Sequence, residues 1–474
     1  MTAGDYLGWT SPRAPCLPPR AVTPPRRWRV RPATKPLRGA FDLPGDKSIG
    51  HRCLLFGALA QGVSTFRNLS GGDDNLRTRA ALEALGVRVV DGDGVVTVHG
   101  VGLGGLTAPS GPIDCGNSGT TMRLLAGVLA AQPFASRLVG DASLLRRPMG
   151  RVTRPLRNRG ARIEGVIDAA RRDEVPPLDI APLDGAKRLF ELEYALPIAS
   201  AQVKSCLLLS GLWADGATTL REPTLSRDHT ERMLAAMGAP LQTLGSAVHL
   251  DPAGWDGVLA PMTIDVPGDP SSAAFFVVAA HVVPGSRIAV RNVLTNPTRT
   301  GFLEVLRDQG GGAVVSPKGE RGGEPVGNLH VGVGETGALR RGARVGGELA
   351  VRSIDEVPAL VAAAAVSPGE SRFDDLGELR VKESDRIAAL VAMVRAFGLD
   401  ADATADGLRV RGGRPRGGAV VRSEGDHRIA MSAAVLALAA EGETLIDDVA
   451  CVDTSFPGFA AILRGLGADI EVES

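Results

Sequence analysis

The chain has few aromatic residues and few cysteines for its length. Only 4% of its 474 residues are Phe, Trp or Tyr, so the core must be built from smaller aliphatic side chains. No cysteine pair has the C-x-x-C spacing of a zinc site or redox motif; the five are Cys16, Cys53, Cys115, Cys206 and Cys451. Scattered cysteines of this kind are typical of a reducing compartment, and we expect a cytoplasmic protein.

Net charge and long apolar runs are also missing. Fifty-three basic residues balance 53 acidic ones, so the overall charge does not suggest a nucleic-acid partner. No apolar run approaches the roughly 20 residues that a membrane span needs. We therefore expect neither nucleic acid nor a membrane as partner, and affinity for anions must come from local clusters of basic residues.

Residues 1–38 differ in composition from the rest of the chain. The stretch "SPRAPCLPPRAVTPPRRWRVRPATKP" is rich in Pro and Arg and has no acidic residue. Such a segment buries too little apolar surface to offset its ordering entropy, which predicts a disordered leader. A nucleic-acid-binding arm and an organelle transit peptide are the alternatives, although the many prolines disfavour the amphipathic helix of a transit peptide.

After this leader the chain repeats itself six times, at intervals of roughly 70 to 87 residues. Each unit opens with a short polar block followed by an Ala- and Leu-rich run. The openings are "PGDKSIGHR" at 44, "DCGNSGTTMR" at 114, "PIASAQVKS" at 197, "VPGDPSSAAFF" at 266, "SIDEVPALVAAA" at 353 and "SEGDHRIAMSAA" at 423. A second helix then ends at a glycine, the residue expected just past a helix; these are Gly86, Gly160, Gly238, Gly310, Gly398 and Gly467.

The repeats predict the fold class and the domains. The opening helices are apolar on all sides, which indicates burial, with sheets outside them. Each unit can hold two helices and four short strands, arranged as βαβαββ. We expect an α/β protein of two domains with three units each, formed by residues 45–264 and by residues 39–44 with 265–474. The polar blocks would then lie at helix N-termini facing a cleft between the domains, where helix dipoles favour anions.

Basic side chains recur in or near these blocks. They are Lys47, Arg52, Arg123, Arg147, Lys204, Arg227, Lys382, Arg386 and Arg428. Any one of them could be an ordinary surface residue, but their shared position at unit openings indicates sites for phosphate and carboxylate groups. The "GDKS" of the first block lacks the second glycine that an ATP-binding P-loop requires.

The acidic residues of the blocks allow two interpretations. Most are expected to be helix N-caps or ion-pair partners: Asp46, Asp73, Asp269, Asp385 and Asp426. Asp355 and Glu383 instead lie in blocks suited to anionic ligands, where a carboxylate is useful if it accepts or relays a proton. The histidines have no metal-binding spacing, and no G-x-S-x-G nucleophile motif occurs.

Taken together, the blocks resemble those of the 5-enolpyruvylshikimate-3-phosphate synthase family from about residue 38 to the end of the chain. Besides the openings, they include "GDASLLRRPMGR", "SRDHTERML", "NPTRTG", "ELRVKESDRI" and "TSFPGF". The resemblance implies a two-domain inside-out α/β barrel. It also implies transfer of the enolpyruvyl group of phosphoenolpyruvate to the 5-hydroxyl of shikimate 3-phosphate, with release of phosphate and without metal or cofactor. We expect a monomer whose partners are these two substrates.

The resemblance also assigns residues. For shikimate 3-phosphate it implies Lys47, Ser48, Arg52, Ser200, Ala201, Gln202, Arg227, Asp355 and Lys382. For phosphoenolpyruvate it implies Lys47, Asn117, Gly119, Arg147, Gln202, Arg386 and Arg428. The implied catalytic residues are Asp355 as acceptor of the 5-hydroxyl proton, Lys382 and Glu383 as proton carriers at the methylene carbon, and Lys47 between the substrates. Fixed cations and dipoles would offset the repulsion between the two anionic substrates.

Two departures from the family's enteric and plant branch point to a second, bacterial branch. "SAQ" replaces "SSQ" in the third opening, and Ser455 stands where that branch has a lysine. Gly119 is nevertheless a glycine, whereas herbicide-resistant members carry alanine there, so we expect sensitivity to glyphosate. A sister family of the same fold uses a UDP-amino sugar and needs a reactive cysteine, for which Cys115 is the nearest candidate. An arginine-tailed nucleic-acid binder is the non-enzymatic alternative.

Overall fold

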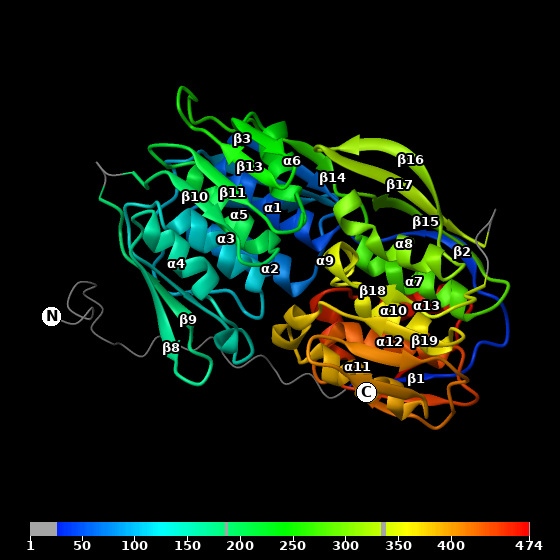
Figure 1. Cartoon of the computed structure of the whole chain (residues 1–474). Helices are drawn as coiled ribbons and strands as arrows, with labels where there is room; N and C mark the ends of the chain where they lie inside the picture. The colour runs from blue at the N-terminus through cyan, green and yellow to red at the C-terminus, as the bar shows by residue number, and fades with distance from the viewer. Residues whose placement is uncertain (1–25, 185–187, 333–337, 474) are drawn as a thin grey trace. The chain divides into compact units, whose positions relative to one another are not determined.

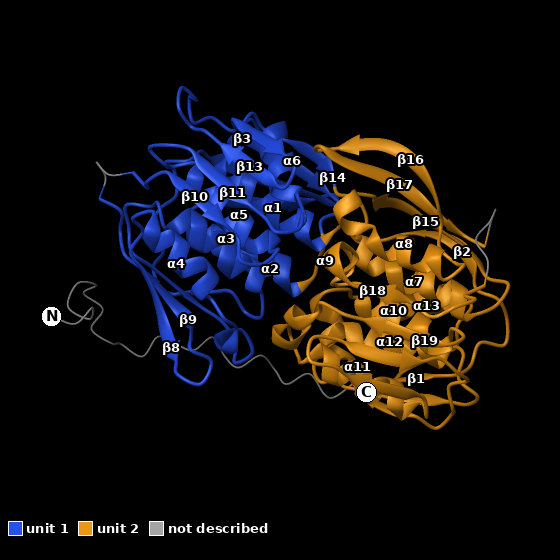
Figure 2. Ribbon diagram, in the orientation of Figure 1, with its two compact units in different colours: residues 1–22, 47–69, 73–265 blue, residues 23–46, 70–72, 266–474 orange. Residues whose placement is uncertain are grey.

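The computed structural model describes residues 26–184, 188–332 and 338–473 (Figure 1). The chain divides into two compact units (Figure 2). Unit 1 contains residues 47–69 and 73–265, and unit 2 contains residues 70–72, 266–473 and the described residues that precede Lys47. Apart from residues 70–72, the chain passes between the units at 46/47 and 265/266, where the repeats led us to expect 44/45 and 264/265. Residues 1–25 of the predicted leader lie outside the described residues.

The six predicted opening helices are present, and each begins in or directly after its polar block. They are α1 (Lys47–Leu59), α3 (Gly119–Leu129), α5 (Ala201–Gly211), α7 (Pro270–Val282), α10 (Val357–Val366) and α12 (His427–Ala437). In unit 2, α7, α10 and α12 contact one another, and all but a few of their side chains are buried. In unit 1, α3 contacts both α1 and α5. All-round apolarity therefore correctly predicted buried central helices.

The second helices end as predicted. They are α2 (Asp73–Ala84), α4 (Gly150–Asn158), α6 (His229–Ala236), α8 (Gly301–Asp308), α11 (Arg386–Ala396) and α13 (Phe459–Gly465). The six glycines that follow them all have positive φ, from 71° at Gly398 to 107° at Gly467. This left-handed conformation suits glycine because it has no Cβ, which explains the recurrence of one residue type at one place in every repeat.

The described residues form six four-stranded sheets, each with one parallel pair and two antiparallel pairs. In unit 1 the orders are β14 (Thr263–Asp265), β3 (Gln61–Arg67), β5 (Val95–Val101), β4 (Arg88–Gly92); β6 (Ile113–Asp114), β7 (Ser136–Val139), β9 (Asp173–Ile180), β8 (Ile163–Asp168); and β10 (Leu192–Ala195), β11 (Thr218–Arg221), β13 (Ala247–Leu250), β12 (Leu241–Leu244).

In unit 2 the orders are β2 (Arg38–Asp42), β15 (Arg287–Leu294), β17 (Glu324–Val331), β16 (Val314–Arg321); β18 (Arg344–Val345), β19 (Glu370–Phe373), β21 (Leu408–Arg411), β20 (Asp400–Ala403); and β22 (Val420–Arg422), β23 (Thr444–Asp447), β1 (Arg27–Val30), β24 (Ile470–Glu473). The remaining α-helix of the described residues, α9 (Gly347–Ser353), precedes α10.

β2 precedes α1 in the chain but pairs in unit 2, and β14 precedes α7 but pairs in unit 1. At 46/47 and at 265/266 the chain therefore leaves a strand paired in one unit and begins a helix in the other.

The prediction that residues 1–38 form a disordered leader is wrong for its last part. Arg27–Val30 forms β1, which pairs with β23 on one side and with β24 on the other. Trp28 and Val30 are buried in the unit 2 core, and the Trp28 ring stacks on Phe459 at 5.5 Å between centroids. In the other sheets this position is held by the last strand of the repeat. The N-terminal segment thus completes the sixth sheet, which supplies the buried surface that its composition alone did not suggest.

Candidate functional site

The start of α1 carries three of the predicted ligand residues. Lys47 is the first residue of the helix and forms an ion pair with Asp74, with 3.0 Å between Nζ and Oδ2. Ser48 follows it and is half-buried. Arg52 is only 3% exposed, and its guanidinium donates to the Ser48 carbonyl oxygen at 2.9 Å. The same guanidinium donates to the hydroxyls of Thr230 at 2.8 Å and Ser205 at 2.7 Å, so α1 is fixed against α5 and α6.

The start of α3 brings together the residues predicted for phosphoenolpyruvate in unit 1. Asn117 accepts a hydrogen bond from Arg147 Nη2 at 2.5 Å and donates to Asp141 at 2.7 Å. Arg147 is buried, with 9% exposed surface. Gly119 begins the helix after Ser118, whose hydroxyl caps it by accepting from the Thr121 backbone N–H. Two side chains and the start of a helix thus converge at one place, and the first N–H groups of a helix have no backbone partner within it.

Gln202 links this group to the start of α5. Its amide nitrogen donates to Thr120 Oγ1 at 2.8 Å, and its amide oxygen accepts from Arg123 Nη1 at 2.6 Å. Ser200 is the N-cap residue of α5, although its side chain makes no capping hydrogen bond, and Ala201 is the first helical residue. The N-termini of α3 and α5 therefore lie together within unit 1, as the repeats predicted.

Arg227 and Lys204, also predicted for the anion site, differ in their surroundings. Arg227 is half-buried in the irregular segment between β11 and α6. Lys204 is 1% exposed and is enclosed by two carboxylates, Glu222 at 2.6 Å and Glu231 at 2.7 Å from its Nζ. The interpretation of Lys204 as a ligand for a substrate anion is wrong, because its charge is already paired with acidic groups inside the protein.

In unit 2 the predicted residues meet at the starts of α10, α11 and α12. Arg386 is 1% exposed, and its guanidinium lies 2.7 Å from Asp426, 2.7 Å from Glu383 and 3.5 Å from Asp355. Arg428 donates to the backbone carbonyl oxygen of Asp355. The predicted catalytic carboxylates and two of the predicted phosphoenolpyruvate ligands are therefore in direct contact with one another.

Lys382 completes this group. It follows the short 3-10 helix Gly377–Val381, and its Nζ lies 3.8 Å from Asp355 Oδ1. An ammonium group can donate a proton and a carboxylate can accept one, so the pair has the groups that acid–base catalysis uses. Burial alone would lower the pKa of Arg386, but the buried Asp426 carboxylate and the partly exposed Glu383 carboxylate raise it, so the guanidinium stays charged.

The expectation that the other acidic residues cap helices or pair with bases is confirmed. Asp269, Asp385 and Asp426 are the N-caps of α7, α11 and α12, and each side chain accepts a backbone N–H of its helix. Asp46 pairs with Arg299 at 2.9 Å, and Asp73 with Arg77 at 3.7 Å.

Arg299 and Glu356 belong to a buried polar group at the starts of α7 and α10, and the sequence analysis did not predict them. Arg299 is 1% exposed and donates to Asp46 at 2.9 Å and to Ser271 Oγ at 3.0 Å. Ser271 in turn donates to Glu356, the fully buried N-cap residue of α10. These contacts join the N-termini of α7 and α10. The only available signal was the polar block "NPTRTG", which holds an arginine between two hydroxyl residues.

Cys115 does not have the environment of a reactive thiol. It is fully buried, and burial raises the pKa of its thiol above the ordinary value, to which the neighbouring Asp114 carboxylate adds. A nucleophilic cysteine needs the opposite, an accessible thiol with a lowered pKa. This environment argues against the alternative that depends on a reactive cysteine.

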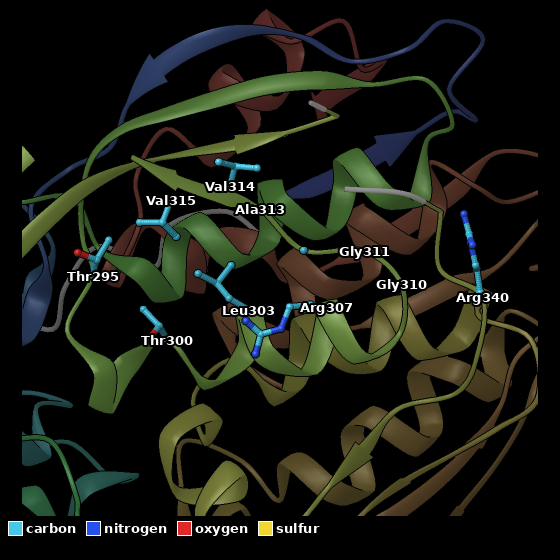
Figure 3. Close-up of a pocket in the computed structure, with 11 residues that line it drawn as sticks. Thr295, Thr300, Leu303, Arg307, Gly310, Gly311, Ala313, Val314, Val315 and Arg340 are labelled. Atoms are coloured by element: carbon cyan, nitrogen blue, oxygen red, sulfur yellow. The ribbon is translucent and has the colours of Figure 1, made fainter. Parts of the chain in front are cut away.

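A pocket of about 650 Å³ lies elsewhere in unit 2, between α8 and β16 (Figure 3). Leu303, Val314 and Val315 form its apolar part, and Arg307 and Arg340 are its charged residues. It contains none of the residues predicted for the substrates. In the part of the chain that the structure describes, no helix is both long enough and apolar enough to cross a membrane.

Comparisons with known proteins identify the family of the chain. The family model described as EPSP synthase (3-phosphoshikimate 1-carboxyvinyltransferase) matches residues 32–463. A 3-phosphoshikimate 1-carboxyvinyltransferase of Methylococcus capsulatus is 49% identical over 92% of this chain and 96% of its own. One of Desulforamulus reducens is 45% identical over 91% and 97%. A solved structure of EPSP synthase from Acinetobacter baumannii has a TM-score of 0.81 and 40% identity, covering 95% of this chain and all of the other. The chain therefore belongs to the EPSP synthase family.

Proposed function

We propose that the chain transfers the enolpyruvyl group of phosphoenolpyruvate to the 5-hydroxyl of shikimate 3-phosphate and releases inorganic phosphate. The observation that carries this proposal is family membership over nearly the whole chain, at 45–49% identity to curated enzymes of that name. In unit 2 the residues that the reaction needs are in contact: the Asp355 carboxylate, the Lys382 ammonium and the Arg386 and Arg428 guanidinium groups.

We assign the shikimate 3-phosphate ligands mainly to unit 1. Ser200 and the Ala201 backbone at the start of α5, together with Arg227, would bind the phosphate, because a helix N-terminus and a guanidinium both favour an anion. Gln202 would contact the ring, and Ser48 with Arg52 the carboxylate. Arg52 supports binding indirectly as well, since its bonds to Ser205 and Thr230 fix the helix that carries Lys47 and Ser48.

We assign phosphoenolpyruvate to Asn117, Gly119 and Arg147 of unit 1 and to Arg386 and Arg428 of unit 2, with Lys47 between the two substrates. Asp355 would accept the proton of the 5-hydroxyl as it attacks the enol carbon of phosphoenolpyruvate. Lys382 and Glu383 would deliver and then remove a proton at the methylene carbon, so that phosphate leaves and the double bond forms again. This scheme uses only acid–base and electrostatic catalysis by side chains of the chain.

We further propose that the enzyme is a glyphosate-sensitive member of the second, bacterial branch and acts as a cytoplasmic monomer. The branch assignment rests on "SAQ" at 200–202 and on Ser455, and the sensitivity rests on Gly119. The contacts of Gly119 specify how it would act: a Cβ there would lie 2.8 Å from Arg123 Nη1 and 3.3 Å from Arg147 Nη1. A methyl group would therefore displace the guanidinium groups beside the proposed phosphoenolpyruvate site.

A choice between two acceptors tests the proposed reaction. The protein is incubated with phosphoenolpyruvate and either shikimate 3-phosphate or UDP-N-acetylglucosamine, and the enolpyruvyl products are measured by mass spectrometry. We expect product only with shikimate 3-phosphate, in keeping with the buried Cys115. Product with the UDP-sugar alone would contradict the proposal.

A further inference from the structure

The irregular segment that carries Arg227 is held by the buried ion pair of Lys204 and Glu222. Ser226 lies between β11 and α6, outside any regular element, so its backbone groups need other partners. Its N–H donates to Glu222 Oε2 at 3.2 Å, and its hydroxyl donates to Glu222 Oε1. Its carbonyl oxygen accepts from Lys204 Nζ at 3.5 Å. The pair therefore contacts all three polar groups of Ser226.

The same ion pair ties this segment to α5. Lys204 lies in the first turn of that helix, two residues after Gln202, and its Nζ lies 2.6 Å from Glu222 Oε2. Both side chains are almost completely buried, at 1% exposed surface each. Charged groups in such surroundings hold their geometry, because breaking the pair leaves a charge without compensation.

We propose that Lys204 and Glu222 are positioning residues for phosphate recognition, which hold Ser226 so that Arg227 stands at a fixed place beside the start of α5. The inference rests on the proposed function, since it assumes that Arg227 and the start of α5 bind the phosphate of shikimate 3-phosphate. It assigns the buried ion pair a role in affinity for one substrate in addition to its role in folding.

Glu231 offers a matched control. It also contacts Lys204 Nζ, at 2.7 Å, but no hydrogen bond joins it to Ser226 among the described contacts. Its second carboxylate oxygen, Oε2, is buried without a hydrogen-bond partner among the described residues. Burial raises the pKa of Glu231, although the Lys204 charge acts in the opposite direction. With two acids and one base, removal of either acid still leaves Lys204 with one carboxylate.

Glu222→Gln and Glu231→Gln therefore make the same change in charge beside the same lysine, but only the first disturbs Ser226. Glu222 Oε2 accepts from both Lys204 Nζ and the Ser226 N–H, and Oε1 accepts from the Ser226 hydroxyl. An amide has one acceptor oxygen and no negative charge, so the Ser226 hydroxyl loses or reverses its bond and the attraction on Lys204 weakens. We expect Glu222→Gln to weaken binding of shikimate 3-phosphate about tenfold or more. Glu231→Gln should leave this affinity within about twofold of the unsubstituted protein.

Binding of shikimate, which lacks the phosphate, distinguishes a loss of phosphate recognition from a general loss of structure. The dissociation constants of shikimate and of shikimate 3-phosphate are measured by titration calorimetry for the full chain and both variants. We expect Glu222→Gln to change the constant for shikimate 3-phosphate alone. Equal constants for the two variants, or equal losses for both ligands, would overturn the proposal.

Ser226→Ala serves if Glu222→Gln does not fold, because it removes only the hydroxyl bond to Glu222. We expect it to weaken shikimate 3-phosphate binding by about threefold and to leave shikimate binding unchanged; no change for either ligand would overturn the inference. Failure of the proposed function has a different signature, since the unsubstituted protein would then not bind shikimate 3-phosphate at all.

Discussion

Arg386 and Asp426 form an ion pair inside unit 2, with 2.7 Å between Nε and Oδ2. Their exposed fractions are 1% and 0%. Burial by itself raises the pKa of Asp426, but the Arg386 guanidinium outweighs it and keeps that pKa below its ordinary value. Because Asp426 caps α12 and Arg386 begins α11, the pair fixes the starts of two helices that carry proposed substrate ligands.

Because of this ion pair, we expect the free energy of unfolding to fall as the pH falls in the acid range. A carboxyl group whose pKa is lower in the folded state contributes stability above its unfolded pKa of about 3.9, and this contribution disappears as the pH falls through the folded value. Asp426→Asn should lower the free energy of unfolding at pH 7 by about 3 kcal/mol, the lower end for a broken buried pair, since Glu383 remains beside Arg386. Urea unfolding should show this difference shrinking below about pH 4. A difference that stays constant over that range would contradict the assignment.

Asp355→Asn should lower turnover by about a hundredfold or more, because the amide cannot accept the proton of the 5-hydroxyl. Binding of both substrates should weaken much less. Asp385→Asn is the matched control: Asp385 caps α11, and asparagine caps a helix about as well. Steady-state rates of both variants and of the unsubstituted protein, measured with both substrates in excess, test this prediction. Near-normal turnover in Asp355→Asn would mean that another group is the base.

Lys382→Met should also lower turnover by about a hundredfold, since it keeps the length of the side chain but removes the transferable proton. The Nζ of Lys382 lies 3.8 Å from Asp355, so the double variant with Asp355→Asn should lose less than the product of the two single effects. Multiplicative losses would show that the two residues act independently.

Gly119→Ala should weaken inhibition by glyphosate about tenfold or more. The added methyl group displaces the Arg123 and Arg147 guanidinium groups, which lie 2.8 and 3.3 Å from the Cβ position, and overpacking by a methyl group costs roughly 1–3 kcal/mol. The KM for phosphoenolpyruvate should rise less, because it is the shorter molecule. Inhibition constants measured against phosphoenolpyruvate test this, and equal constants for both proteins would refute it.

The repeated parts of the fold could be predicted from the sequence because each rests on local chemistry. An all-round apolar run after a polar block predicts a buried helix, and a glycine after a helix predicts a left-handed residue; both expectations held in all six repeats. β1 could not be found in this way, since its partners β23 and β24 lie more than 400 residues further along the chain. The alternation in "RWRV" was the available signal, but the surrounding prolines masked it.

Residue types at the site could be predicted better than their partners. Asp355, Lys382, Arg386 and Arg428 were found from their blocks, and the structure brings them into contact. Lys204 was misread, because the carboxylates that neutralise it come from Glu222 and Glu231, which only the folded chain places beside it. Spacing along the chain shows where a charge is but not what compensates it.

Release of inorganic phosphate from phosphoenolpyruvate, measured with and without shikimate 3-phosphate, tests the central claim most directly. The account predicts rapid release only when both substrates are present, in proportion to the enolpyruvyl product formed, and its loss in Asp355→Asn. Release at the same rate without shikimate 3-phosphate, or none with both substrates present, would contradict it.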